Sequence, residues 1–437
     1  MMYLLILLYV MLVLLRPQDY PEWIERLSGP LLPGVLVLAA GFWLLRRGKS
    51  FAEPQYALLL MFLGAMMFSR AANGWFGGAL LQWSAFAPVL LAFVLTANAV
   101  DSRARARVLM AVFVLCAAVL ALHGVGQVRD GIGWTGVGLS QGTRIQYVGI
   151  FSDPNDLGML FVMCVPMAMH LAGGGGQLRR LGWTAVAGLL LYGIYLTNSR
   201  GTMLALIAMV GVYVWFRWGL FRAMLMGAIA FAALRLVPSR MQDLSVGESS
   251  AFGRVEAWYD GLMMFLGSPL WGIGAGSYVD NQGAMTAHNS FVLVLTETGI
   301  IGFTLWLAFV GYCFRMMLEV VAHHEAPVGE GGVGREEAGA EWPLEVEAEW
   351  DRDRRTAMAL LLSLTGCFCA AFFLSRSYVV LLYLLAALVV GFYTSMRGRY
   401  PALRAFALSH DLLRWAALAM ALVVALYLVV KLMLGVA

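Results

Sequence analysis

The chain has few charged residues for its length. Of its 437 residues, 13% are Asp, Glu, Lys or Arg and 61% are hydrophobic, whereas a soluble domain carries about 25% charged residues. Apolar stretches of roughly 15 to 20 residues recur from end to end, and each is close to the length that crosses a bilayer. This pattern excludes a soluble globular domain and predicts an all-α polytopic membrane protein.

Cysteine and histidine are also scarce. The five cysteines all lie inside apolar stretches, and the spacing in Cys367-Phe-Cys369 is too short for a disulfide or a zinc knuckle. We therefore interpret them as small buried hydrophobic residues. The pair His323-His324 has no second ligand cluster near it in the sequence, so no metal and no cofactor is expected. A net charge of +4 is ordinary for an inner-membrane protein and does not indicate a nucleic-acid partner.

About 13 apolar stretches are candidate transmembrane helices, and a total of 12 to 14 is predicted. The first lacks a basic leader and a small-residue cleavage site, so we interpret it as a retained helix and not as a signal peptide. The stretches lie near residues 2–15, 31–45, 56–70, 80–98, 107–124, 155–172, 181–196, 202–216, 219–236, 300–317, 357–374, 377–395 and 413–434.

Basic residues cluster in alternate connections between these helices. By the positive-inside rule such connections lie in the cytoplasm, and the basic clusters lie at residues 46–49, 103–107, 179–180, 217–222, 352–355 and 397–404. The remaining connections must then face outward. They are residues 16–30, 71–79, 125–154, 197–201, 237–299 and 375–376, so His288 is expected on the outer side of the membrane.

The same layout predicts four regions. Residues 1–124 form N-terminal transmembrane helices, and residues 125–317 form a core with two outward segments, 125–154 and 237–299, that are too long to be simple turns. Residues 318–356 are rich in Gly and Glu and are interpreted as a flexible cytoplasmic insert with one short amphipathic piece, 342–350. Residues 357–437 form the C-terminal transmembrane helices.

The outward stretch TRIQYVGIFSDPNDLG, residues 143–158, contains a helix start. Asp153 fits an N-cap, Pro154 the first helical position and Asp156 the acidic third residue. The alternative is that Asp153 and Asp156 form a metal-binding pair. Capping does not explain Arg144, which is a candidate contact for an anionic ligand.

Two further outward stretches carry arginines. In YLTNSRGTML, Arg200 lies at a helix end before Gly201, where it either contacts a ligand or reaches toward lipid headgroups. Residues 254–266 read as an amphipathic helix with Val255, Trp258, Leu262 and Phe265 on one face. Arg254 would then stand at the start of that helix, where a cation opposes the dipole, so an anion is expected nearby.

A fourth outward stretch, AMTAHNSFVLVLTETGIIGF, places His288-Asn289 before a long apolar run. We predict a short helix from Asn289 or Ser290 to Thr298, a break at Gly299 and the transmembrane span after it. A single histidine in a loop is more often structural than catalytic, so the residues of this stretch leave both interpretations open.

Together these stretches resemble the O-antigen ligase and Wzy-type polysaccharide polymerase superfamily, over about residues 140–315. The resemblance rests on the following motifs in this order: Phe151-Ser-Asp153-Pro154-Asn155, Ser199-Arg200-Gly201, Arg254-Val-Glu-Ala-Trp258, Pro269-Leu-Trp-Gly272-Ile-Gly274, and His288-Asn289-Ser-Phe291 followed by Glu297-Thr-Gly299. Each motif is weak alone, and their occurrence in order on one predicted face is fairly specific.

The resemblance implies a GT-C-type bundle and an inverting, metal-independent glycosyltransferase. Its donor would be an undecaprenyl-pyrophosphate-linked glycan, and its acceptor either a second glycan or lipid A-core. The implied catalytic residues are His288 as general base and Arg200 and Arg254 at the pyrophosphate. Arg144 and Asn289 are implied further substrate contacts. The rather short segment 237–299 favours a polymerase over a ligase, and transfer to a protein side chain is not excluded.

A lipid-linked glycan flippase or other transporter is the competing class of function. Transporters place ionisable residues at mid-span and have broken helices in paired halves. Here the predicted spans are nearly free of charge, and the distinctive residues cluster at one face, which favours the enzyme.

Overall fold

The computed structural model describes residues 1–20, 31–234, 244–281, 286–323 and 344–435, and within these ranges the only regular elements are helices. They are α1 (Met2–Leu15), η1 (Pro17–Asp19), α3 (Leu31–Leu44), α4 (Pro54–Ala72), α5 (Phe76–Ala99), α6 (Arg103–Asp130), η2 (Gly149–Phe151), α7 (Pro154–Ala172), α8 (Gln177–Thr197), α9 (Arg200–Trp218), α10 (Leu220–Leu234), α11 (Leu244–Gly267), α12 (Tyr278–Asn281), α13 (Ser290–Ala322), α14 (Leu344–Ala371), α15 (Val380–Arg399) and α16 (Leu408–Leu434).

Each predicted transmembrane stretch coincides with one of these helices, which confirms an all-α polytopic membrane protein. Among the described residues, nine helices are long and apolar enough to cross a membrane, and α3 and part of α10 are shorter apolar helices. The total of 12 to 14 spans stays a prediction. The region 318–356 begins inside α13 and ends inside α14, and residues 324–343, including His324, lie outside the described part.

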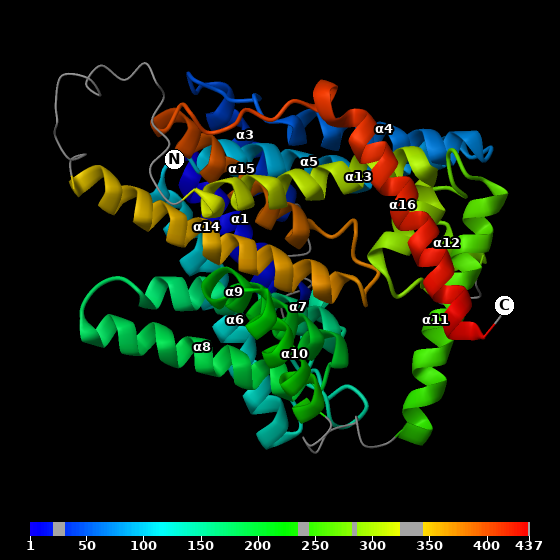
Figure 1. The fold of residues 1–437 in the computed structure, drawn as a ribbon, viewed down its shortest axis with the longest axis horizontal. Coiled ribbons are helices and arrows are strands. Elements are labelled where there is room, and N and C mark those ends of the chain that lie inside the picture. Colours follow the sequence, from blue (N-terminus) through cyan, green and yellow to red (C-terminus); the bar gives the residue numbers. More distant parts are fainter. Residues whose placement is uncertain (21–30, 235–243, 282–285, 324–343, 436–437) are drawn as a thin grey trace.

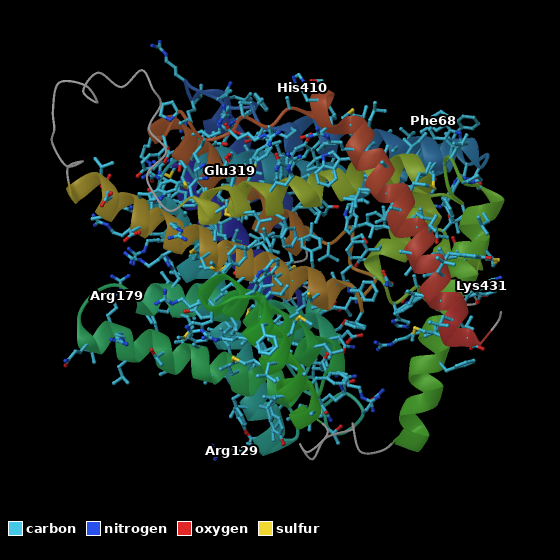
Figure 2. All side chains as sticks on the ribbon, viewed as in Figure 1. Phe68, Arg129, Arg179, Glu319, His410 and Lys431 are labelled. Carbon is cyan, nitrogen blue, oxygen red and sulfur yellow. The ribbon has the colours of Figure 1, made fainter. Side chains whose placement is uncertain are left out.

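The helix ends alternate between two faces of the molecule, which we name by their residues. The His288 face holds the starts of α7, α9 and α13, and therefore Asp153, Arg200 and His288. The opposite arginine face holds the starts of α6, α8 and α14 and the end of α7. In Figure 2, Arg179 of α8 and Phe68 near the end of α4 lie at opposite ends of the molecule. The placement of the basic connections in the cytoplasm stays a prediction.

Burial separates central helices from peripheral ones. α7, α13 and α15 are buried over most of their lengths, whereas α16 and α9 are largely exposed. Figure 1 shows α13 and α14 running through the middle of the bundle, while α11 and α16 cross its right-hand end. The cysteines follow this pattern, because four are buried and Cys369 is half-buried. The central helices are therefore the scaffold that holds the His288 face.

The predicted helix break at Gly299 is confirmed. Gly299 has φ 64° and ψ −170° inside α13, a conformation that is essentially restricted to glycine. The turn after α11 docks on this break through backbone hydrogen bonds: Ile300 N–H donates to Pro269 O at 2.8 Å, and Ile273 N–H donates to Thr296 O at 3.0 Å. The turn thus takes up groups that the broken helix leaves without a helical partner.

We expect a Gly299→Ala variant to lose roughly 2 kcal/mol or more of unfolding free energy. A Cβ at this position would lie 2.4 Å from the Leu270 carbonyl carbon and 2.5 Å from the Trp271 nitrogen, and neither backbone atom can move aside. Thermal unfolding of the purified protein in detergent measures the effect. Gly64→Ala is the matched control, because no atom lies within 4 Å of its Cβ position; an equal loss in both variants would contradict the docking role.

Candidate functional site

α11 brings Arg254 to the His288 face. Val255, Trp258, Leu262 and Phe265 are buried, which confirms the predicted apolar face of this helix. The predicted start at Arg254 is wrong, however, because α11 begins at Leu244. Arg254 therefore lies within the helix, and the dipole argument for a nearby anion does not apply to it.

The start of α7 is the N-cap that the sequence predicts. The Asp153 carboxylate accepts a hydrogen bond from Asn155 N–H at 2.7 Å and from Asn155 Nδ2 at 2.8 Å. Asn155 Oδ1 in turn accepts from Arg144 Nη2 at 2.9 Å and from Ser199 Oγ at 2.7 Å. Arg144 also donates to Thr197 O at 2.9 Å. Asn155 therefore joins three outward stretches that are far apart in the sequence.

Arg200 is the first residue of α9. Ser199 caps this helix by accepting from Thr202 N–H, so its position relative to α7 is fixed through Asn155. Gly201 packs closely on Phe373, whose Cβ would lie 3.0 Å from a Cβ at residue 201. The charge of Arg200 acts on Arg254, so the two predicted catalytic arginines lie close together.

His288 stands in a loop with φ 47°, in the left-handed region. Residues other than glycine rarely adopt this conformation, and such residues concentrate at functional sites. Asn289 follows it as the N-cap of α13, and its Oδ1 accepts from Phe291 N–H at 2.8 Å and Val292 N–H at 3.1 Å. Its Nδ2 is buried and has no hydrogen-bond partner among the described residues, which leaves a donor beside His288.

Three charged groups surround the His288 imidazole. Burial is the first cause that lowers its pKa, and Arg254 and Arg376 lower it further, whereas Asp153 raises it. The net effect places the pKa of His288 below its ordinary value of about 6.5. Burial also lowers the pKa of Arg254, with Arg200 adding to this and Asp153 opposing it. The imidazole is therefore neutral at pH 7, as a general base must be.

Arg376 is a residue that the sequence reasoning missed. Its Nε and Nη2 donate to the two carboxylate oxygens of Asp156, each at 2.7 Å. Its backbone N–H donates to Ser290 Oγ at 3.1 Å, which ties the α14–α15 connection to the start of α13. The only sequence signal was a short Ser375-Arg376 turn, and no local pattern pairs it with a carboxylate 220 residues away.

We expect Arg376→Met to lower the unfolding free energy by about 2 kcal/mol. Removing one partner of a fully buried ion pair costs roughly 3–5 kcal/mol, but the Arg376 side chain is 37% exposed and Asp156 only 2%, so solvent screens part of the interaction. Thermal unfolding tests this. The double variant Arg376→Met/Asp156→Leu should recover much of the loss, because no unpaired carboxylate remains, and a double variant as unstable as the single one would contradict the explanation.

A second group of polar contacts lies where the turn after α11 meets the break in α13. Glu297 is buried, and its carboxylate accepts from Tyr278 N–H at 3.1 Å and Tyr378 Oη at 2.8 Å. Arg70 at the end of α4 stacks 4.5 Å over the Trp75 ring. A Cβ at Gly276 would approach its Nη2 to 2.8 Å. The glycines of this turn thus admit Arg70 to the His288 face, which sequence spacing did not predict.

The described residues contain no cluster of three or more His, Cys, Asp and Glu side chains that could hold a metal ion. Asp153 caps α7, and Asp156 is bound by Arg376. The residues at this face are instead suited to acid–base chemistry at His288 and to anion binding by arginines. The predicted residues His288, Arg200 and Arg254 come together in one cluster, and Arg144 joins its supporting network.

Comparison with known proteins agrees with this arrangement. A search of the curated proteins finds no match to the chain. Residues 185–307, which run from α8 into α13 and include Arg200, Arg254 and His288, match the model of a family described as O-antigen ligase. Members of this family are membrane enzymes of the glycosyltransferase and ligase type. The match supports the resemblance seen in the motifs, and residues 185–307 are similar to the O-antigen ligase family.

Proposed function

We propose that the protein is an inverting, metal-independent glycosyltransferase that polymerises the repeat units of a surface polysaccharide at the periplasmic face of the bacterial inner membrane. The donor is a glycan on undecaprenyl pyrophosphate, and the acceptor is the terminal sugar hydroxyl of a second lipid-linked glycan. The observation that carries the proposal is the gathering of His288, Arg254 and Arg200 at one face, within the segment that matches the O-antigen ligase family.

The chemistry of the transfer fits these groups. The imidazole of His288 accepts the proton of the acceptor hydroxyl as that oxygen attacks the anomeric carbon. The bond from this carbon to the phosphate oxygen breaks on the opposite side of the sugar, which inverts the configuration. Arg200 and Arg254 stabilise the negative charge that develops on the departing pyrophosphate. The proton on His288 then passes to water.

The supporting residues hold this geometry. Asn289 fixes the start of α13 next to His288, and its buried Nδ2 is a donor for an acceptor or donor hydroxyl. We assign Arg144 to a substrate contact as well, in addition to its hold on the turn that presents Arg200.

The distribution of buried carboxylates supports an enzyme over a transporter. Among the described residues, the buried acidic side chains lie close to helix ends or to the break at Gly299, except Asp353, which lies within α14 ahead of the apolar stretch predicted from residue 357. They are Glu53, Asp156, Glu297, Asp353 and Asp411. A transporter that moves charged cargo would place such groups at mid-span.

A direct assay tests the proposal and its near neighbour. The purified full-length protein is supplied with a defined undecaprenyl-pyrophosphate oligosaccharide, and the products are analysed by length. A ladder of products is the expected result. A single transfer that requires lipid A-core would establish the ligase, which the description of the matching family favours. No covalent change with either acceptor would exclude both enzymes.

The pH dependence gives a further prediction. Transfer needs the neutral imidazole, so the rate should fall as the pH drops through the pKa of His288, which lies below about 6.5. The Asp153 carboxylate raises this pKa, so Asp153→Asn should shift the acidic limb to lower pH. Asn caps a helix about as well as Asp, so the α7 start is kept. A limb that moves to higher pH, or does not move, would contradict the role of His288 as the base.

A further inference from the structure

A cavity of about 660 Å³ lies at the arginine face, remote from His288. It is bounded by the start of α6, the end of α7 and the middle of α9 and of α14. α7 has 19 residues, so at a rise of 1.5 Å each its two ends lie roughly 28 Å apart. The cavity is therefore separated from the candidate catalytic cluster by about the thickness of a bilayer.

Among the residues that the structure describes, four arginines line this cavity and no carboxylate does. They are Arg103, Arg107, Arg352 and Arg355. Arg103 donates to Asp353 Oδ1 at 3.3 Å and to Glu349 O at 3.2 Å, and Arg352 donates only to Ala348 O. Arg107 and Arg355 make no hydrogen bond or ion pair to any residue that the structure describes. The cavity thus holds more positive charge than the protein around it neutralises.

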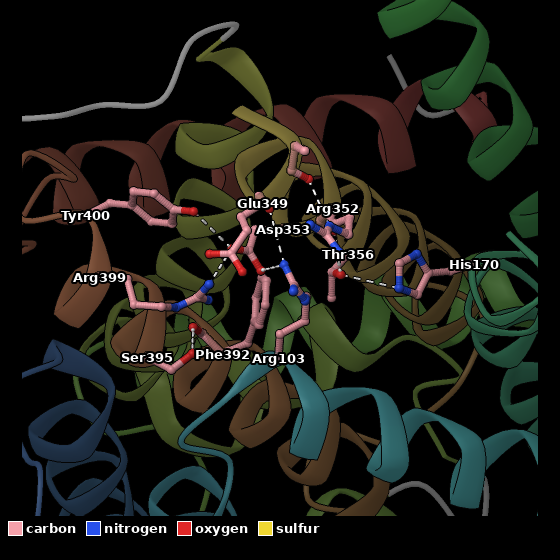
Figure 3. A network of polar contacts seen from close by, with 11 residues as sticks. Arg103, His170, Glu349, Arg352, Asp353, Thr356, Phe392, Ser395, Arg399 and Tyr400 are labelled. Atoms are coloured by element: carbon pink, nitrogen blue, oxygen red, sulfur yellow. Dashed lines mark hydrogen bonds and ion pairs between the residues drawn. The ribbon is translucent and has the colours of Figure 1, made fainter. Parts of the chain in front are cut away.

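Asp353, the buried carboxylate next to Arg352 in the chain, is shared between Arg103 of the cavity and two residues outside it. Figure 3 shows Asp353 between Arg103 on one side and Arg399 and Tyr400 on the other. Its Oδ2 accepts from Arg399 Nη1 at 2.5 Å and from Tyr400 Oη at 3.3 Å. Among the described residues, the charges that act on Arg107 are the like charges of Arg179 and Arg103. Like charges this close repel one another unless an anion lies between them.

A polar histidine completes the charged end of the cavity. His170 Nε2 lies 3.3 Å from Thr356 Oγ1, a contact drawn as a dashed line in Figure 3. The charges of Arg107, Arg355 and Arg103 all act on this imidazole. Thr356 Oγ1 also donates to Arg352 O at 2.9 Å. The Thr356 hydroxyl has thus donated its only hydrogen, and the hydrogen-bond donors available to a phosphate at this end of the cavity are the guanidinium groups of the arginines.

The rest of the cavity wall is apolar and open to the lipid side. It is formed by Val165, Pro166, Met169, Met209, Val210, Tyr213, Met358, Ala359 and Leu362. Met169 is 52% exposed, Val210 42% and Tyr213 44%, although all three lie within apolar helices of a membrane protein. A site that binds free phosphate has no use for such a wall, whereas a hydrocarbon chain would cover it.

We propose that this cavity binds a phosphate-headed anionic lipid of the leaflet at the arginine face, with the phosphate held by Arg107 and Arg355 and a hydrocarbon chain lying along α7 and α9. Basic pockets between transmembrane helices bind anionic lipid headgroups in this way. The site is distinct from the proposed transfer reaction, because the two lie at opposite ends of α7. The phosphate of the bound lipid supplies the negative charge that the cluster of arginines lacks.

Native mass spectrometry of the purified full-length protein tests the site. Phosphatidylglycerol and phosphatidylcholine with identical acyl chains are added at equal concentration, so that only the headgroup charge differs. The wild-type protein should retain phosphatidylglycerol in preference. Each arginine near a membrane surface contributes about 1 kcal/mol, or roughly fivefold, so Arg107→Gln/Arg355→Gln should lower retention by about 25-fold.

The control is Arg47→Gln/Arg222→Gln, which removes two exposed arginines of the same face that do not line the cavity. This variant should retain the lipid as the wild type does. Equal retention of both lipids by the wild type, or an equal loss in the two double variants, would overturn the proposal. Displacement of the lipid by inorganic phosphate at matched concentration would also overturn it and would identify a free-phosphate site. Arg355→Gln alone, at an exposed position, keeps the test valid if the double variant fails to fold.

Discussion

His288→Ala is expected to reduce glycosyl transfer by a factor of 10² to 10⁴, the range that a positioned general base contributes. The imidazole is the group beside Arg254 that can accept a proton near neutral pH, since burial and its cationic neighbours lower its pKa. Single-turnover measurement with a defined lipid-linked oligosaccharide gives the rate of the chemical step. Donor binding should change little, because the lost group acts on the acceptor.

The matched control for this variant is His410→Ala. His410 is exposed near the start of α16, at the opposite face, and its removal should leave the rate unchanged. A second check is the acidic limb of the pH profile, which should disappear from the residual activity of His288→Ala. A folded His288→Ala protein that transfers at the wild-type rate would exclude the assigned base.

Arg254→Gln is expected to lower kcat by about 10² to 10³, because donors aimed at developing negative charge contribute on this scale. Arg254→Lys should recover only part of the loss, since an ammonium retains the charge but not the planar fork that matches phosphate. The substitution also takes away a positive charge that lowers the pKa of His288. The acidic limb of the pH profile should therefore move to higher pH in Arg254→Gln.

Arg222→Gln serves as the control for a general effect of charge, because Arg222 is exposed in α10 and remote from His288. The charge of Arg200 acts on Arg254, so Arg200→Gln and Arg254→Gln should be non-additive when combined. If kcat stayed constant in Arg254→Gln and only KM rose, the arginine would bind the donor without stabilising the transition state.

Much of the molecule is predictable from hydropathy and charge. The apolar stretches locate the helices because every backbone group in a bilayer must be bonded internally, and the arginine-rich connections separate the two faces. Local chemistry also gives the N-cap at Asp153 and the break at Gly299, since both depend on neighbouring residues. The motifs predict the residues of the site through the order in which they occur, because each motif alone is too short to be specific.

What local pattern does not contain is the pairing of distant groups. The sequence pattern places the start of α11 at Arg254, whereas the helix begins at Leu244. The reason is that the regular spacing of apolar residues is a stronger signal than the residues that mark a helix end. The Arg376–Asp156 ion pair, the network at Asn155 and the approach of Arg70 to Gly276 each join stretches far apart in the chain. In none of these cases do the adjacent residues in the sequence indicate the distant contact partner.

The physical reason lies in how each property arises. A transmembrane helix is specified by its own residues, because each apolar side chain contributes its own favourable free energy of transfer into the bilayer. The charge state of His288 depends instead on burial and on Arg254, Asp153 and Arg376, which reach it from other elements. The arginines of the cavity at the opposite face are likewise gathered from α6 and α14. Sequence thus suffices to locate the helices, whereas the environment of each ionisable group exists only once those helices pack.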